Sequence, residues 1–113
     1  MHELSLIQSL LSQLEVTIEQ NKLTRITKVV LQLGDFRQCV PELLQFMFTA
    51  LTEDTKIAGA QLVIEPVPIR MECLSCHQTF VISRYVFCCP HCKKTQLKLL
   101  SGKEFVLKAI EGE

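Results

Sequence analysis

The sequence predicts an α+β fold: a small three-stranded sheet with two helices on one face, plus an inserted zinc-knuckle module of four cysteines, of the zinc-ribbon kind. Two segments place apolar residues at helical spacing, three others alternate as strands do, and two Cys-x-x-Cys pairs lie between the last two strands. Of the 113 residues, 48% are hydrophobic and 21% charged, a globular composition. Helices that cover one face of a sheet bury the apolar sides of both elements.

The two helices are predicted over residues 3–20 and 41–54. The first ends near Asn21, and the second begins at Pro41, which a first helical turn tolerates. Steps of three and four residues place one apolar stripe on each helix. The first stripe is Leu4, Ile7, Leu11, Leu14 and Ile18, and the second is Leu43, Leu44, Met47, Phe48 and Leu51.

The strands are predicted over residues 25–33, 60–65 and 104–110. The first ends at Gly34-Asp35, and Pro66 and Pro68 end the second. We therefore expect an α/β domain over residues 1–69, completed by a returning strand within 99–113, with the cysteine module over 70–98. The charges separate these parts: residues 1–69 hold five basic and eight acidic groups, a net of −3, whereas residues 70–98 hold five and one, a net of +4.

The strongest chemical signal is a paired cysteine pattern. Cys73 and Cys76 form one pair, Cys89 and Cys92 the other, and twelve residues separate the pairs. Zn²⁺ takes four tetrahedral thiolates from two such turns, and a full thiolate shell leaves no place for a catalytic water, so the predicted zinc is structural. A hairpin over residues 79–87 is expected to bring the turns together. Two disulfides, or thioredoxin-like dithiols, are the alternatives that this pattern disfavours.

Three neighbours leave the ligand set open. Cys88 adjoins Cys89 and competes with it as a ligand, although Cys89 has the spacing to Cys92. His77 and His91 flank the pairs and could replace a thiolate, but such histidines are more often solvated or hydrogen-bonded neighbours.

The positive charge of residues 70–98 raises a second hypothesis, a zinc-ribbon protein that binds nucleic acid through Arg84, Lys93 and Lys94. Few aromatic side chains accompany these cations, so nucleic acid is not favoured as a partner. A structural adaptor with an inert N-terminus is the third hypothesis.

The N-terminal Met1-His2-Glu3 is a second candidate metal site. The α-amine, backbone nitrogens and the His2 imidazole can chelate one ion, and planar nitrogen donors suit Ni(II) or Cu(II); Glu3 could add an oxygen. The N-terminus lacks the features of a secretory signal, and no apolar stretch is long enough to span a membrane, so we expect a cytoplasmic protein.

Taken together, these features resemble the HypA/HybF nickel metallochaperones of hydrogenase maturation. The resemblance covers Met1-His2-Glu3, Leu33-Gly34-Asp35, Pro41-Glu42 and both cysteine pairs. It implies Ni(II) as a transferable cargo at the N-terminus, with His2 as the key side chain and Glu3 influencing delivery or partner contact, and a structural Zn(II). It also implies a HypB-type GTPase partner and the hydrogenase large subunit as client, with urease maturation served by some members.

The sequence gives no sign of an enzyme. It contains no nucleophile–base pair or paired-carboxylate pattern, and the Gly34-Asp35 turn lacks the further glycine and lysine of a phosphate-binding loop. The function predicted from these residues and this resemblance is a non-catalytic nickel metallochaperone.

Overall fold

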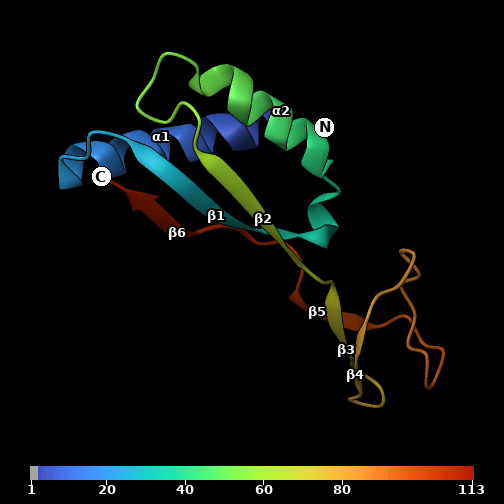
Figure 1. Cartoon of the computed structure of the whole chain (residues 1–113). Helices are drawn as coiled ribbons and strands as arrows, with labels where there is room; N and C mark the ends of the chain where they lie inside the picture. The colour runs from blue at the N-terminus through green and yellow to red at the C-terminus, as the bar shows by residue number, and fades with distance from the viewer. Residues whose placement is uncertain (1–2) are drawn as a thin grey trace. The chain divides into compact units, whose positions relative to one another are not determined.

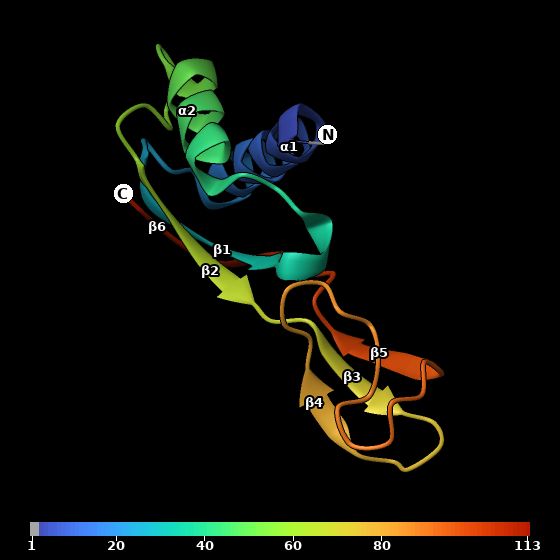
Figure 2. The same ribbon diagram turned by 90° about the vertical axis from the view of Figure 1, so that its right-hand side faces the viewer.

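A computed structural model describes residues 3–113 of the chain (Figures 1 and 2). Its elements, in order, are α1 (Glu3–Asn21), β1 (Ile26–Gly34), the 3-10 helix η1 (Asp35–Arg37), α2 (Pro41–Thr52), β2 (Gln61–Val67), β3 (Arg70–Cys73), β4 (Thr79–Val81), β5 (Leu97–Ser101) and β6 (Phe105–Gly112). None of the described helices has the length and apolar character that a membrane crossing requires.

The chain divides into two compact units. The helical unit combines residues up to Gln32 with Cys39–Glu65 and Val106–Glu113. The cysteine unit combines Leu33–Gln38 with Pro66–Phe105. The boundaries expected from the sequence, after residues 69 and 98, stay a prediction; residue 98 lies within β5.

The first sheet has the strand order β2-β1-β6, and α1 and α2 lie together on one of its faces (Figure 2). The core between helices and sheet is apolar. Its fully buried side chains include Ile7, Leu10, Leu14, Val29, Leu31, Leu44 and Phe48. Each contributes about 1.5–3 kcal/mol by leaving water. The predicted fold class, two helices on one face of a three-stranded sheet plus a cysteine module, is confirmed.

The buried face of α1 differs from the predicted stripe. Leu10 is fully buried, whereas Leu4 is 49% exposed and Leu11 only half-buried. Because Leu10 and Leu11 both continue the helical spacing from Ile7, the pattern could not decide between them. The buried position nearest the N-terminus is Glu3, a residue type that hydrophobic periodicity does not count.

The second helix is shorter than predicted. It ends at Thr52, and Asp54 adopts a left-handed φ of 61°. Thr52 is buried and Leu51 is 44% exposed, the reverse of the predicted stripe. The Thr52 hydroxyl donates to the Phe48 carbonyl oxygen at 2.7 Å, which satisfies the buried hydroxyl without a partner from outside the helix.

Strand β2 runs through Pro66, which was predicted to end it. In the order β2-β1-β6 this strand lies at the edge, where a residue without an N–H group removes no hydrogen bond from a neighbouring strand. The strand therefore ends at Val67, one residue before Pro68.

The second sheet belongs to the cysteine unit and has the order β4-β3-β5. Strand β3 pairs antiparallel with both neighbours, so that Met71 lies opposite Phe80 on one side and Leu99 on the other. The predicted hairpin over residues 79–87 is wrong: Thr79–Val81 alone is a strand, and it pairs with β3. The apolar residues after it favour a second strand by composition, but residues 83–86 form a tight turn instead.

Two glycines in the cysteine unit allow a close backbone approach. A Cβ atom on Gly34 would lie 2.0 Å from the carbonyl oxygen of Gly102. The Gly34 N–H donates to the Glu104 carbonyl at 2.7 Å, and the Phe36 N–H donates to the Gly102 carbonyl at 2.8 Å. The Leu33-Gly34-Asp35 sequence therefore ends β1 and also joins the two segments of the cysteine unit, Leu33–Gln38 and Pro66–Phe105.

Candidate metal centres

The two cysteine pairs are built by the same local structure. In the first pair, the Cys73 N–H donates to the Gln78 carbonyl at 2.9 Å, and the His77 N–H donates to the Cys73 carbonyl at 2.8 Å. His77 has a left-handed φ of 62°. These bonds fold residues 73–78 into one closed turn.

The second pair repeats this arrangement sixteen residues later. The Cys89 N–H donates to the Lys94 carbonyl at 2.8 Å, the Lys93 N–H donates to the Cys89 carbonyl at 2.9 Å, and Lys93 has a φ of 66°. In this turn the amides of His91 and Cys92 also point at the Cys89 sulfur, at 3.4 and 3.5 Å. Amide donors aimed at a sulfur stabilise its thiolate form, which is the form that binds metal.

The four sulfur atoms converge on one point. Cys73 Sγ lies 3.5 Å from Cys92 Sγ, Cys76 Sγ lies 3.6 Å from Cys89 Sγ, and all four sulfurs lie within 4.8 Å of one another. A zinc ion with Zn–S bonds near 2.3 Å would separate its thiolates by roughly 3.8 Å. The donor set and its spacing thus fit a tetrahedral thiolate site. All four cysteines are free thiols, without the disulfides of the alternative hypothesis.

The thiols influence one another's ionisation. The backbone amide of Cys76, aided by other hydrogen bonds and opposed by burial, lowers the pKa of Cys73 to about 6. The backbone amide of Gln78 also lowers the pKa of Cys76, but burial and the neighbouring thiols outweigh it and raise that pKa to about 11. Ionising one sulfur therefore opposes ionisation of the next, and a dication among the four sulfurs removes this opposition.

The three neighbours do not join this cluster. His77 and His91 are exposed, and His77 Nδ1 lies 3.8 Å from a Glu72 carboxylate oxygen. Cys88 is half-buried and lines a separate cavity. Cys73 and Cys89, by contrast, are both 0% exposed. Within residues 3–113, the converging donors are thus the four cysteines that the spacing predicted.

The N-terminal candidate site is described only from Glu3, because Met1 and His2 lie outside the described residues. Glu3 begins α1 and is 2% exposed. Its Oε2 accepts a hydrogen bond of 3.2 Å from the backbone N–H of Val40, the residue that precedes α2. The carboxylate is thus part of the packing between the start of α1 and the start of α2.

Sequence reasoning missed the sheet that supports the cysteine pairs. The Leu74 N–H donates to the Gln96 carbonyl at 2.9 Å, and β3 and β5 pair up to Cys73 and Leu97. The half-buried Leu97 and Leu99 alternate with the exposed Lys98 and Leu100, a period of two that could have revealed β5.

Comparison with known proteins identifies relatives along the full length. Residues 1–112 match the family described as "Hydrogenase/urease nickel incorporation, metallochaperone, hypA". The chain is 39% identical to the hydrogenase maturation factor HypA of Geobacter metallireducens, over 113 residues and all of both chains. It is 31% identical to the factor of the same name from Desulfitobacterium hafniense, over all of this chain and 99% of the other.

The fold is also that of solved structures. The solution structure of the Ni metallochaperone HypA from Helicobacter pylori matches with a TM-score of 0.68 at 24% identity, covering 99% of this chain and 97% of that one. A second solution structure, titled HypA protein, matches with a TM-score of 0.72 at the same identity and covers all of this chain and 97% of the other. With its full length matched at both levels, the chain belongs to the HypA family of nickel-incorporation metallochaperones.

Proposed function

We propose that this protein binds Ni(II) at its N-terminus and helps to deliver it to the hydrogenase large subunit during maturation of [NiFe]-hydrogenase. The observation that carries the proposal is the match of residues 1–112 to a nickel-incorporation family, because it includes both Met1-His2-Glu3 and the cysteine pairs. In this proposal nickel is a transferable cargo, and the helical unit is the part that carries it.

The proposed nickel donors are the Met1 α-amine, backbone amide nitrogens and the His2 imidazole. Ni(II) favours planar nitrogen donors, and loss of amide protons would leave the bound unit roughly neutral beside the positive end of α1. We assign Glu3 to the site as a carboxylate that fixes the start of α1, since it is buried and accepts the Val40 N–H. It influences delivery from that position.

The proposed role of Cys73, Cys76, Cys89 and Cys92 is to hold a structural Zn(II). Their converging sulfurs support this assignment, and a shell filled by four thiolates gives the metal no open position for catalysis. Zinc supplies the folding energy of the cysteine unit. A reducing compartment such as the cytoplasm keeps the thiols available for it.

The proposed partners follow from the family. A HypB-type GTPase would supply nucleotide hydrolysis, and the hydrogenase large subunit would receive nickel. Because the family description also includes urease, urease maturation factors are further candidates. We propose no catalytic activity for the chain itself.

Calorimetric titration of Ni(II) into zinc-loaded protein with a native N-terminus tests the nickel site. The same titration is run on His2→Ala and on a version extended by two residues before Met1, with zinc content measured for all three. We expect one nickel site in the parent and its loss in both variants, with zinc unchanged. The extension is the sharper variant, because it alters no side chain and removes only the free α-amine.

Equal nickel binding by all three proteins would reject the N-terminal site. Release of zinc from all three proteins as nickel is added would instead place both metals on the cysteines. Either result would leave the family assignment intact while overturning the proposed location of the cargo.

A further inference from the structure

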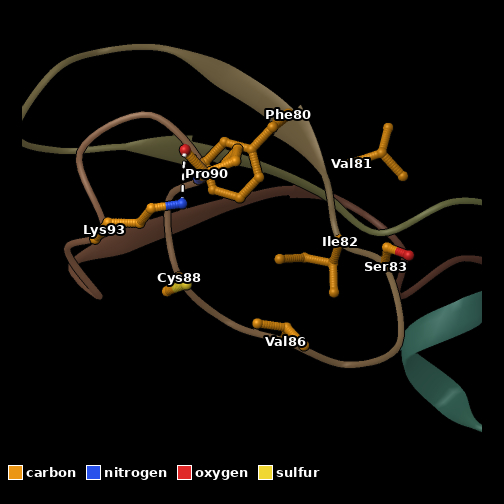
Figure 3. A pocket seen from close by; sticks show the side chains of 8 residues that line it. All are labelled: Phe80, Val81, Ile82, Ser83, Val86, Cys88, Pro90 and Lys93. Carbon is orange, nitrogen blue, oxygen red and sulfur yellow. Dashed lines mark hydrogen bonds between the residues drawn. The ribbon is translucent and has the colours of Figure 1, made fainter.

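The cysteine unit has a surface cavity that none of the four clustered cysteines lines. This cavity, of about 240 Å³, opens beside the second cysteine pair (Figure 3). Its lining is mainly apolar and includes Phe80, Ile82, Val86, Cys88 and Pro90, with Lys93 as the cation. In Figure 3, Ile82, Val86 and Cys88 follow the loop around the space, and Lys93 lies at its side with its nitrogen directed toward Pro90.

One wall of the cavity is a strained turn. The Val86 N–H donates to the Ser83 carbonyl at 3.1 Å, and the two residues between them, Arg84 and Tyr85, have φ of 55° and 56°. This is the φ pattern of a type I′ turn, in which Gly, Asn or Asp usually occupy both positions. Bulky residues in such a conformation cost about 1–3 kcal/mol each and persist where the surroundings enforce them.

Neighbouring side chains hold this turn in place. The Tyr85 hydroxyl donates to the Asp35 carbonyl at 3.3 Å, and the Phe87 ring meets the edge of the Phe36 ring with centroids 6.0 Å apart. The turn nevertheless leaves Val86 57% exposed at the cavity. The strained turn at Arg84 and Tyr85 thus holds the apolar side chain of Val86 in contact with solvent.

The charge of the chain that forms the cavity is mainly positive, although Glu72 on β3 lies opposite Thr79 and Tyr85 contacts Asp35. From Cys73 to Lys103 the sequence contains five basic residues and no acidic one. With four thiolates on one zinc ion contributing −2, this stretch keeps a net charge of about +3. Lys93 Nζ donates to the Pro90 carbonyl at 3.1 Å, and since an ammonium has three donors it can still bind an incoming carboxylate.

We propose that this cavity is a docking site for an acidic protein segment that inserts one apolar side chain beside Val86 and pairs a flanking carboxylate with Lys93. The cavity is smaller than the roughly 300–1,000 Å³ of small-molecule sites, which suits a single side chain. The proposal depends on the fold of the cysteine unit and is independent of where nickel binds.

The aromatic geometry favours protein over nucleic acid. Phe36, Tyr85 and Phe87 are 36%, 50% and 39% exposed, but Phe36 and Phe87 meet at 65° and Tyr85 and Phe87 at 41°, so each ring already has an aromatic neighbour. Nucleic-acid bases stack on aromatic faces that are open to them. The exposed Val86 also suits an apolar side chain better than a base.

The test uses zinc-loaded, ¹⁵N-labelled full-length protein and a capped synthetic peptide, Glu-Asp-Leu-Phe-Asp-Glu. Two matched peptides replace either Leu-Phe by Gly-Gly or the four acids by lysine, and a 20-nucleotide oligo-dT is the fourth probe. We expect the acidic apolar peptide to shift the amide signals of residues 80–93 and to bind at least tenfold more tightly than the other three probes.

Variants identify the surface. Val86→Asp should weaken peptide binding at least tenfold, whereas Leu100→Asp, a similarly exposed apolar residue on β5 at 44%, should leave it within twofold. Zinc content and the amide spectrum outside the turn should be those of the parent in both. Equal binding by the three peptides, unchanged binding by Val86→Asp, or tighter oligo-dT binding at the same signals would each overturn the proposal.

Discussion

The two units of this chain are stabilised in different ways. The helical unit buries leucine, isoleucine, valine and phenylalanine between two helices and a sheet. In the cysteine unit, the buried hydrophobic side chains are Leu33, Ile69, Met71, Cys73 and Cys89, so two of these five are thiols placed to bind metal. A unit of fewer than about 50 residues usually needs a metal or disulfides in place of a large core.

The difference suggests how one short chain can combine a domain held by its apolar core with one that depends on metal. With the proposed zinc bound, the free concentration of zinc would set the stability of the cysteine unit, whereas the apolar core sets that of the helical unit. Structural zinc in small modules supplies on the order of 10–16 kcal/mol, enough to convert an unfolded segment into a folded one.

Zinc removal should have the largest effect. Chelation, or Cys73→Ser, is expected to collapse the amide signal dispersion of the cysteine unit, while the helical circular dichroism of α1 and α2 remains. The reason is that the cysteines without their metal cannot replace the core that this unit lacks. ¹⁵N–¹H spectra with and without chelator, beside zinc quantification, provide the measurement.

Cys88→Ser is the matched control for this prediction. It removes a neighbouring thiol whose sulfur lies outside the cluster, so zinc content and spectrum should stay those of the parent. Loss of zinc in Cys88→Ser would contradict the exclusion of Cys88 from the zinc site. Well-dispersed amide signals of the cysteine unit after chelation would contradict its dependence on metal.

Truncation of the helical core should come next. Phe48 is 2% exposed, and Phe48→Ala is expected to lower the free energy of unfolding of the helical unit by about 3–5 kcal/mol because a large cavity replaces the ring. Urea denaturation followed by helical circular dichroism measures it.

Phe46→Ala is the control for this prediction. Its side chain is 70% exposed, so the free energy of unfolding should change by no more than about 0.5 kcal/mol. Zinc content should be the same in both, and a joint loss would mean that the units do not stabilise themselves separately.

Glu3 should give an intermediate effect that separates packing from metal binding. Glu3→Ala leaves the Val40 N–H without its carboxylate acceptor, at a cost of about 1–3 kcal/mol, whereas Glu3→Gln keeps the shape and an acceptor oxygen. We expect the alanine variant to lose more stability in urea, with nickel affinity nearly retained in the glutamine variant. A large loss of nickel affinity in Glu3→Gln with unchanged stability would instead make the carboxylate a nickel ligand.

The sequence predicted most of this fold because its signals are local. Apolar spacing, Pro41 and the glycine after β1 each act within a few residues, and the four cysteines carry their own spacing. What it missed depends on distant partners. Strand β5 and the pairing of β4 are defined by β3, the choice of Leu10 over Leu11 by the sheet beneath α1, and the continuation of β2 through Pro66 by its edge position.

The smallest effect is expected at the surface of the helical unit, where Lys108 Nζ lies 2.9 Å from Glu65 Oε1. Both side chains are about half exposed, at 52% and 41%. Water and salt screen such a pair, so a double-mutant cycle with Lys108→Ala and Glu65→Ala should give a coupling energy of about 0.2–1 kcal/mol that falls at about 1 M NaCl. Thermal and urea denaturation at low and high salt measure it.

A coupling energy above about 2 kcal/mol, or one that salt leaves unchanged, would mean that charge at this surface adds to the apolar core in stabilising the helical unit. The contrast between a unit stabilised by its apolar core and a unit stabilised by metal would then have to be redrawn.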